Sequence, residues 1–444
     1  MIDERRALLN PKNFYGRPYR ALRCVRVRGV SCRPIAPPAA TRRVTQADPK
    51  GPTRERVSEV APRMLIGQSL NAYCGLGTIG RAGIDDHGEP KLGADGSGVG
   101  PMKKWARRGL FGAICAWAAT LSAGTGAARE LTLGAAAAVS GRYFGAALRT
   151  EALDDRRYRD LAARQLTCVT AEYEMKWGSV EPMRGQFDWT KADALVAFAK
   201  AHGQKIRGHN LFWHERLPQW LSRGSFSPTE LKDLLVAHIA TEAGRYKGAI
   251  YAWDVVNEPF ADDGTWRRSI WYQAMGPAYV SIALRAARAA DPKAKLYINE
   301  YNVETDGPKM RALYELVTSL KAAGAPIDGV GFQAHYIAGA APKDLQSVMA
   351  RFSALGLDVA VTELDLRIRL PATRRMLKAQ AADYASVVRA CRATPRCVGV
   401  TTWGITDALS WIPKYFSGYG SALPFDENYR PKPAVKAMIK AWAK

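Results

Sequence analysis

The sequence predicts an α/β protein in which residues 129–444 form a closed barrel of eight parallel strands surrounded by helices, a (β/α)8 TIM barrel. Short β-branched and aromatic segments alternate with amphipathic segments from about Arg142 onward, and the alternation repeats eight times. Eight strand and helix units are the number that closes into a barrel. An open, doubly wound sheet is the alternative, but no glycine-rich phosphate loop follows the first expected strand, which removes the usual nucleotide-binding interpretation.

The eight expected strands are short and mostly apolar. They are Tyr143–Leu148, Cys168–Glu172, Lys205–Asn210, Ala252–Asn257, Lys295–Asn299, Gly329–Gln333, Asp358–Leu364 and Val398–Trp403. Between them lie helical periods such as SPTELKDLLVAHIATEA and GPKMRALYELVTSLKAAG, with Ser, Pro or Gly at positions typical of helix caps.

The first 128 residues differ in composition from the rest of the chain. Residues 1–101 are rich in Arg, Pro and Gly and have no sustained period of 2 or 3.6, so we expect them to be disordered. Residues 102–128 combine the basic segment KKWARR, an apolar stretch and a run of small residues, which are the three parts of a signal peptide. The arginine pair is typical of the twin-arginine route, but its flanking residues leave a Sec signal equally open.

This signal peptide bears on where the protein begins and where it works. Because a signal belongs at an N-terminus, we hypothesise that translation starts at Met102 and that residues 1–101 are an upstream reading-frame artefact. The apolar stretch from Gly109 to Gly124 is shorter than the ~20 residues of a membrane-spanning helix, so we expect no stable membrane insertion after cleavage. We therefore expect a secreted or periplasmic protein, and a monomer.

The net charge of +23 is unevenly distributed. About half of it lies in residues 1–110, outside the expected barrel. A nucleic-acid partner would rest on this charge alone, so we expect none. The 47% hydrophobic fraction is that of a globular protein with a sizeable core.

Polar side chains crowd the C-terminal ends of the expected strands, where a barrel of this type builds its active site. Glu258 follows the segment YAWDVVN, and Glu363 ends the segment VAVTE. A single glutamate at a strand end is more often an ion-pair partner or a solvated loop residue. Two carboxylates at one site, however, are what glycoside hydrolysis requires, one as acid and one as nucleophile or base.

Tryptophans lie close to the same strand ends, namely Trp177, Trp213, Trp403 and Trp411. Aromatic faces stack on the apolar faces of pyranose rings, so tryptophans beside carboxylates favour a carbohydrate over a nucleotide or a peptide. Each tryptophan alone is more often a core residue than a sugar contact. Their coincidence with the glutamates at one end of eight strands outweighs that interpretation.

Seven segments carry a resemblance to a known family. They are TAEYEMKWGSVEPMRGQFDW, RGHNLFWH, WDVVNEP, INEYN, GVGFQAHY, VTELD and TTWGITDALSW, in the order and at the spacing that the family has. From about Tyr143 to Trp442 the chain resembles glycoside hydrolase family 10, the retaining endo-β-1,4-xylanases. The resemblance implies xylan as the substrate and no cofactor.

The resemblance also implies roles for individual residues. Glu258 corresponds to the general acid/base and Glu363 to the nucleophile, and Asn257 corresponds to the residue that hydrogen-bonds the sugar 2-hydroxyl. His335 corresponds to the partner of the nucleophile, with Asp365 orienting its imidazole. The matching sugar contacts are Glu172, Lys176, His209, Trp213, Gln333, Trp403 and Trp411.

Three positions depart from the family pattern. Tyr173 stands where the family usually has Asn, which replaces an amide by a bulky phenol and puts the second sugar subsite in doubt. Asn210 replaces a common Thr, and Ile412 replaces a common Arg. None of these changes affects the two carboxylates.

The cysteines and acidic residues complete the expectations. Cys391 and Cys397 resemble a disulfide seen in many family members, and an exported protein meets the oxidising conditions that a disulfide needs; two free thiols are the alternative. Cys168 lies in an apolar strand and is expected to be a buried, inert thiol. No cluster has zinc or calcium spacing, so no metal is expected.

Two other functions remain open from the sequence. A retaining β-1,4-glucanase or mannanase would use the same barrel and the same carboxylates, and only the sugar contacts would differ. A non-catalytic xylan-binding protein would typically have lost one carboxylate, and both are present here.

Overall fold

The structure is a computed structural model, and it describes residues 131–443. The disordered segment and the signal peptide expected in residues 1–128 lie outside the described residues.

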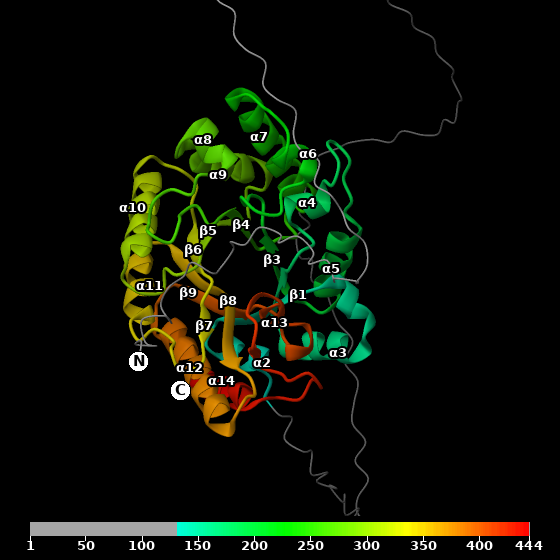
Figure 1. Cartoon of the computed structure of the whole chain (residues 1–444), viewed down its shortest axis with the longest axis vertical. Coiled ribbons are helices and arrows are strands. Elements are labelled where there is room, and N and C mark those ends of the chain that lie inside the picture. The colour runs from blue at the N-terminus through cyan, green and yellow to red at the C-terminus, as the bar shows by residue number, and fades with distance from the viewer. Residues whose placement is uncertain (1–130, 444) are drawn as a thin grey trace, which may run out of the picture. The chain divides into compact units, whose positions relative to one another are not determined.

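Eight parallel strands form a closed barrel, as Figure 1 shows from one end. They are β1 (Tyr143–Leu148), β2 (Cys168–Ala171), β3 (Lys205–His209), β4 (Ala252–Asn257), β5 (Lys295–Glu300), β6 (Gly329–Phe332), β8 (Asp358–Arg369) and β9 (Cys397–Thr402). Each strand pairs in parallel with the next, and β9 pairs with β1, which closes the ring. The predicted eight-stranded barrel is confirmed.

Helices follow the strands and surround the barrel (Figure 1). The longer ones are α2 (Leu133–Val139), α3 (Arg156–Gln165), α5 (Thr190–Ala201), α7 (Pro228–Arg245), α9 (Ala278–Ala290), α10 (Pro308–Ala322), α11 (Leu345–Ala354), α12 (Arg374–Ala393) and α14 (Pro433–Ala443). Short helical turns lie in the loops: η1 (Thr150–Asp154), α4 (Trp177–Val180), α6 (Gln219–Ser222), α8 (Ile270–Met275), η2 (Asp407–Leu409) and α13 (Ile412–Tyr415).

The N-terminal cap of α7 illustrates how the sequence determines where a helix begins. Ser227 accepts a hydrogen bond from the backbone N–H of Glu230, and the Glu230 carboxylate accepts one from the backbone N–H of Ser227. This capping box satisfies two donors that would otherwise be unpaired at the start of the helix. Pro228 occupies the first turn, where a missing N–H costs nothing.

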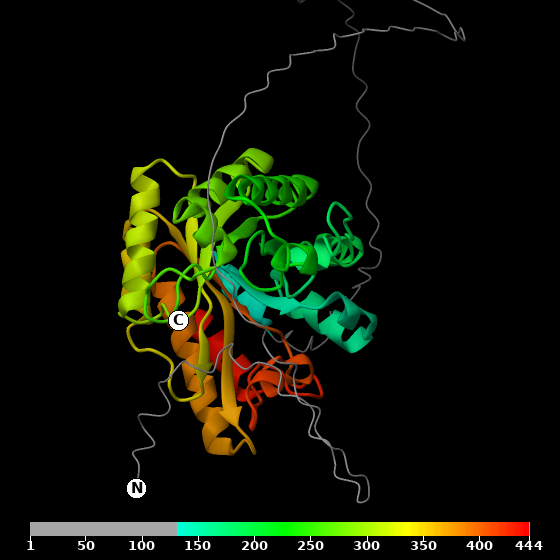
Figure 2. The ribbon, with the colours of Figure 1, turned by 45° about the horizontal axis from the view of Figure 1, so that its top comes forward.

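Strand β8 is the one barrel strand that differs from its expected range by more than one residue. It continues from Leu364 to Arg369 because two short strands extend its pairing, β7 (His335–Ile337) in parallel and β10 (Tyr419–Gly420) antiparallel. Figure 2 shows β8 as the long orange strand beside α12. The pairing with β7 sets His335 opposite Asp365 in register, which positions both residues for the site described below.

The core is formed by apolar side chains between the barrel and the surrounding helices. Inside it, backbone and rings approach closely: a Cβ added at Gly208 on β3 would lie 2.1 Å from the Trp253 ring on β4. A buried ion pair between Arg207 and Asp254 joins the same two strands. These contacts hold β3 and β4 rigidly below the ends that carry the functional side chains.

Candidate active site

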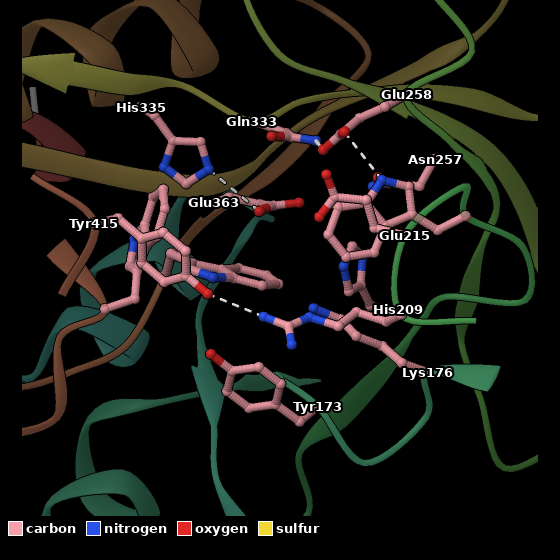
Figure 3. A pocket seen from close by; sticks show the side chains of 14 residues that line it. Tyr173, Lys176, His209, Glu215, Asn257, Glu258, Gln333, His335, Glu363 and Tyr415 are labelled. Atoms are coloured by element: carbon pink, nitrogen blue, oxygen red, sulfur yellow. Dashed lines mark hydrogen bonds and ion pairs between the residues drawn. The ribbon is translucent and has the colours of Figure 1, made fainter. Parts of the chain in front are cut away.

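One pocket opens at the C-terminal ends of the barrel strands (Figure 3). Ten residues expected from the sequence line it: Lys176, His209, Trp213, Asn257, Glu258, Gln333, His335, Glu363, Trp403 and Trp411. Because the carboxyl ends of parallel strands meet at one rim, side chains far apart in the sequence converge there. The arrangement fits a site that binds a polar, ring-containing ligand.

Glu258 directly follows β4 and has a left-handed backbone conformation, with φ of 55°. This conformation is uncommon for a residue other than glycine and persists where the surrounding structure fixes it. The carboxylate is buried and accepts two hydrogen bonds from neutral groups, the indole Nε1 of Trp213 at 3.0 Å and the amide Nε2 of Gln333 at 3.0 Å. Each of its oxygens therefore has one neutral donor.

Glu363 lies on β8 and receives a different pair of donors. The amide Nδ2 of Asn299 donates to its Oε1 at 2.7 Å, and the imidazole Nε2 of His335 lies 3.3 Å from its Oε2. The other ring nitrogen of His335 lies 2.9 Å from Oδ2 of Asp365, which also accepts from the indole of Trp411 at 2.8 Å. Glu363 thus stands at the end of a buried chain of hydrogen bonds.

The protonation of His335 follows from this chain. Burial disfavours the charged imidazole, but Asp365 and then Glu363 outweigh burial and raise the pKa of His335 to about 10. At neutral pH the ring is therefore an imidazolium that donates to both carboxylates. It places a positive charge directly beside Glu363.

Lys176 supplies a second cation to the pocket. Its ammonium lies 4.9 Å from the ring centroid of Tyr173, 4.8 Å from that of Trp213 and 5.7 Å from that of Trp403. Burial lowers its pKa, while Glu363 counters that effect most strongly among the neighbouring carboxylates. The aromatic faces and the carboxylates together keep a charged group in a largely buried position.

His209 is held from both ring nitrogens. Nδ1 lies 3.0 Å from Oδ2 of Asp254, and the amide Nδ2 of Asn210 lies 3.3 Å from Nε2. The ring meets Trp403 edge to face, with centroids 5.0 Å apart. Asn210, where the family often has Thr, therefore acts on the orientation of His209 rather than on the pocket wall.

Three residues singled out from the sequence, two of them with expected site roles, lie outside the pocket lining. Asp365 is fully buried behind His335, as its expected orienting role requires. Glu172 is buried and forms an ion pair with Arg149 at 2.7 Å, and its expected contact with sugar stays a prediction. Trp177 is also away from the pocket, stacked on His238 with ring centroids 3.8 Å apart.

Sequence reasoning missed Asn299 on β5. Its amide Nδ2 donates to Oδ1 of Asn257 at 2.8 Å as well as to Glu363, and the hydroxyl of Thr362 donates to its Oδ1 at 2.7 Å. The side chain is completely buried. A polar residue at the end of an apolar strand was the available signal, the same one that identified Glu258.

The pocket also contains four residues with no expected role as ligand contacts: Tyr173, Glu215, Arg216 and Tyr415. Burial, and next the neighbouring Glu258, raise the pKa of Glu215 to about 7. Ile412, in contrast, is fully buried at the start of α13 and does not line the pocket. Of the three departures from the family pattern, Tyr173 is therefore the one that lines the pocket.

The cysteines follow the expected pattern. Cys391 and Cys397 form a disulfide that links the end of α12 to the start of β9, with Cα atoms 5.2 Å apart. Cys168 is a free thiol buried in β2, and burial raises its pKa to about 12, so it is unreactive. Within residues 131–443 no group of three or more His, Cys, Asp or Glu side chains is arranged to hold a metal ion.

Comparisons with known proteins agree with this geometry. The endo-1,4-beta-xylanase A of Phanerodontia chrysosporium is 47% identical over 298 residues, which are 67% of this chain and 73% of that protein. The endo-1,4-beta-xylanase of Agaricus bisporus is 44% identical over 304 residues, 68% of this chain and 91% of that protein.

Solved structures show the same similarity. The glycosylated endo-beta-1,4-xylanase of Gloeophyllum trabeum superposes with a TM-score of 0.68 at 46% identity, covering 70% of this chain and 99% of that one. Xylanase 10B of Thermotoga petrophila, in complex with xylobiose, gives a TM-score of 0.70 at 36% identity, covering 71% and 98%. Residues 132–441 match the model of glycosyl hydrolase family 10, and the chain belongs to that family.

Proposed function

We propose that this protein is an endo-β-1,4-xylanase that hydrolyses internal xylosidic bonds of xylan with retention of configuration. Glu363 acts as the nucleophile and Glu258 as the general acid/base. The observation that carries this assignment is the asymmetry of their partners. Glu363 faces the imidazolium of His335, whereas Glu258 receives only the neutral donors of Trp213 and Gln333.

The two steps of a double displacement require this asymmetry. In the first step Glu363 attacks the anomeric carbon and forms a glycosyl ester, while Glu258 gives its proton to the departing glycosidic oxygen. In the second step Glu258 takes a proton from water, which attacks the same carbon and releases Glu363. A nucleophile needs its negative charge and an acid needs its proton, so a cation beside one and neutral donors beside the other suit these roles.

Asn257 is suited to bind the sugar at the cleavage point. Its Oδ1 accepts a hydrogen bond from Asn299, so its Nδ2 is the group left to donate to a sugar hydroxyl. Trp403 and Trp411 supply aromatic faces, and Lys176 and His209 supply polar contacts along the pocket. A hydrogen bond to the 2-hydroxyl that strengthens in the transition state lowers the barrier rather than only binding the substrate.

A retaining glucanase or mannanase would use the same carboxylates, and a xylan-binding protein would use the pocket alone. The relatives named above are xylanases at 44% and 47% identity, which supports xylan as the substrate. Both carboxylates are present in the pocket with their partners, which supports catalysis over binding alone.

The test is reducing-sugar release from xylan, with carboxymethylcellulose and mannan in parallel. Glu363→Ala should abolish xylan hydrolysis, while Glu315→Ala, an exposed glutamate on α10, should leave it at the wild-type rate. Proton NMR of the first product should reveal the β-anomer. Hydrolysis of glucan or mannan instead of xylan would change the substrate, and an inverted product would exclude the nucleophilic role of Glu363.

We further propose that residues 102–128 direct export, that residues 1–101 precede the true start, and that the barrel of residues 129–444 works as a monomer outside the cytoplasm. No helix in residues 131–443 has the length and apolarity to cross a membrane. N-terminal sequencing of the intact precursor tests the start at Met102, and residues from the first hundred would refute it. Light scattering after size-exclusion chromatography tests the monomer.

A further inference from the structure

One side of the pocket carries a cation and two phenols that the proposed hydrolysis does not use. Arg216, in the loop after β3, directs its guanidinium into this side, where Nη2 donates to the hydroxyl of Tyr415 at 2.9 Å. The same guanidinium lies 5.9 Å from the ring centroid of Tyr173. We call Arg216, Tyr173 and Tyr415 the arginine–tyrosine cluster.

The two phenols face a common space. Figure 3 shows the hydroxyl groups of Tyr173 and Tyr415 turned toward each other on one side of the pocket. Burial and then Glu172 raise the pKa of Tyr173 to about 12, and Tyr415 adds to the rise. Tyr173 therefore remains a neutral donor at neutral pH.

Arg216 is an exposed residue whose charge acts on the neighbouring Glu215 and lowers the pKa of that carboxyl, against the larger effect of burial, which raises it. No carboxylate of residues 131–443 lies within 4.0 Å of its guanidinium, although Arg149 nearby is paired with Glu172 at 2.7 Å. Lys176 adds a second positive charge close by, and Arg216 in turn contributes to lowering its pKa. The carboxyl group of Glu215, with its pKa near 7, is largely neutral below that pH.

We propose that the arginine–tyrosine cluster is a subsite for the carboxylate of a uronic acid side group on the polysaccharide. The planar guanidinium matches a carboxylate with two parallel N–H donors, and the phenols can add hydrogen bonds to the same oxygens. An unsubstituted xylose unit has no anionic group, so the main chain can accept hydrogen bonds from Arg216 but cannot form an ion pair with it. The inference rests on the proposed xylanase function and specifies which xylan the enzyme prefers.

The experiment compares kcat/KM on glucuronoxylan with kcat/KM on the same polymer after its carboxyl groups have been reduced to alcohols. The wild-type protein should favour the acidic polymer by roughly threefold to fivefold, the range of a partly exposed charge pair. Arg216→Gln should bring this ratio to about one. Arg216→Lys keeps the charge but loses the two parallel N–H donors of the guanidinium, so its ratio should lie between those of Arg216→Gln and the wild type.

The matched control is Arg374→Gln, which removes one exposed arginine from the start of α12. It should keep the wild-type ratio, because it changes net charge by the same amount far from the cluster. A wild-type ratio of one, or a ratio unchanged in Arg216→Gln, would overturn the inference while leaving xylan hydrolysis intact. Failure of the wild-type protein to cleave either polymer would instead refute the proposed function, and the subsite with it.

Discussion

Replacing Asp365 with Asn should make the enzyme's activity depend on a histidine that titrates near neutral pH. His335 bridges Asp365 and Glu363, and these carboxylates outweigh burial to raise its pKa from 6.5 to about 10. That rise corresponds to about 5 kcal/mol in favour of the imidazolium. Because Asp365 is the stronger of the two attractions, its loss removes the larger share, and Asn keeps the size and the acceptor oxygen.

The expected result is a new basic limb in the pH profile. Once His335 loses its proton near neutral pH, Glu363 exchanges a charged donor for a neutral one. A hydrogen bond to a charged group contributes about 1.5–3 kcal/mol, so kcat/KM at pH 8 should fall roughly tenfold to a hundredfold. At pH 5, where the imidazolium persists in both proteins, the two should differ much less.

The assay is kcat/KM on an aryl β-xylobioside between pH 4 and pH 10. Asp358→Asn is the matched control, since it changes an aspartate at the opposite end of the same strand, where it pairs with Arg396 at 2.6 Å. It should leave the shape of the profile unchanged. If Asp365→Asn also kept the wild-type shape, an imidazolium beside Glu363 would not be what supports its reactivity.

The same shift predicts how stability changes with pH. A group whose pKa is higher in the folded state stabilises fully below its unfolded value, and that contribution is lost as pH rises through the folded value. His335 should therefore stabilise the wild-type protein fully below about pH 6.5 and progressively less toward pH 10. Thermal melts over this range should show a smaller decrease for Asp365→Asn than for the wild type.

Three further predictions follow from other contacts. Gly331→Ala should leave the barrel folded but lower kcat by at least tenfold. The added Cβ would lie 2.2 Å from Oδ1 of Asn299 and displace that amide from the nucleophile. An unchanged kcat would show that the amide is dispensable. Replacing Cys391 and Cys397 with Ala should lower the free energy of unfolding by about 2 kcal/mol, because the disulfide closes a loop with a sequence separation of 6. Equal urea midpoints for the variant and the wild type would refute this prediction. Glu215→Gln should stabilise the protein at pH 8 but not at pH 4. Burial raises the pKa of Glu215 to about 7, so its ionisation at pH 8 costs roughly 1–2 kcal/mol after solvent screening. Thermal melts in which the variant and the wild type differ equally at both pH values would contradict this prediction.

The sequence predicted most of the barrel because strand periodicity is local. Seven of the eight barrel strands begin and end within one residue of their expected bounds, since apolar runs bounded by caps and glycines carry that information. The extension of β8 was missed because it depends on pairing with β7 and β10, which are three and two residues long. Such short strands have no period of their own to detect.

The sequence predicted the site residues whose type and strand-end position both point to catalysis. It did not predict contacts between residues that are distant in the sequence. Glu258 and Glu363 stand at strand ends with recognisable motifs around them. Glu172 does so too, but its partner Arg149 lies 23 residues earlier, and the local sequence did not indicate this ion pair. Arg216 and Tyr415 meet across 199 residues, and neither local sequence reports the other.

Asn299 explains how the barrel holds the two glutamates in a fixed relation. Its amide nitrogen donates to Glu363 on β8 and to Asn257 on β4, while its own oxygen is fixed by Thr362. The backbone N–H of Glu258 donates to the carbonyl of Asn299 at 2.9 Å, which ties the left-handed residue to the same strand. One hydrogen-bonded route between the two glutamates therefore passes through β5, a strand that carries neither of them, and a second passes through Gln333, whose amide donates to Glu258 and whose carbonyl accepts from the N–H of Glu363. Strand β5 can fix the spacing of the two glutamates because its Asn299 is hydrogen-bonded both to Glu363 on β8 and to the backbone of Glu258 after β4.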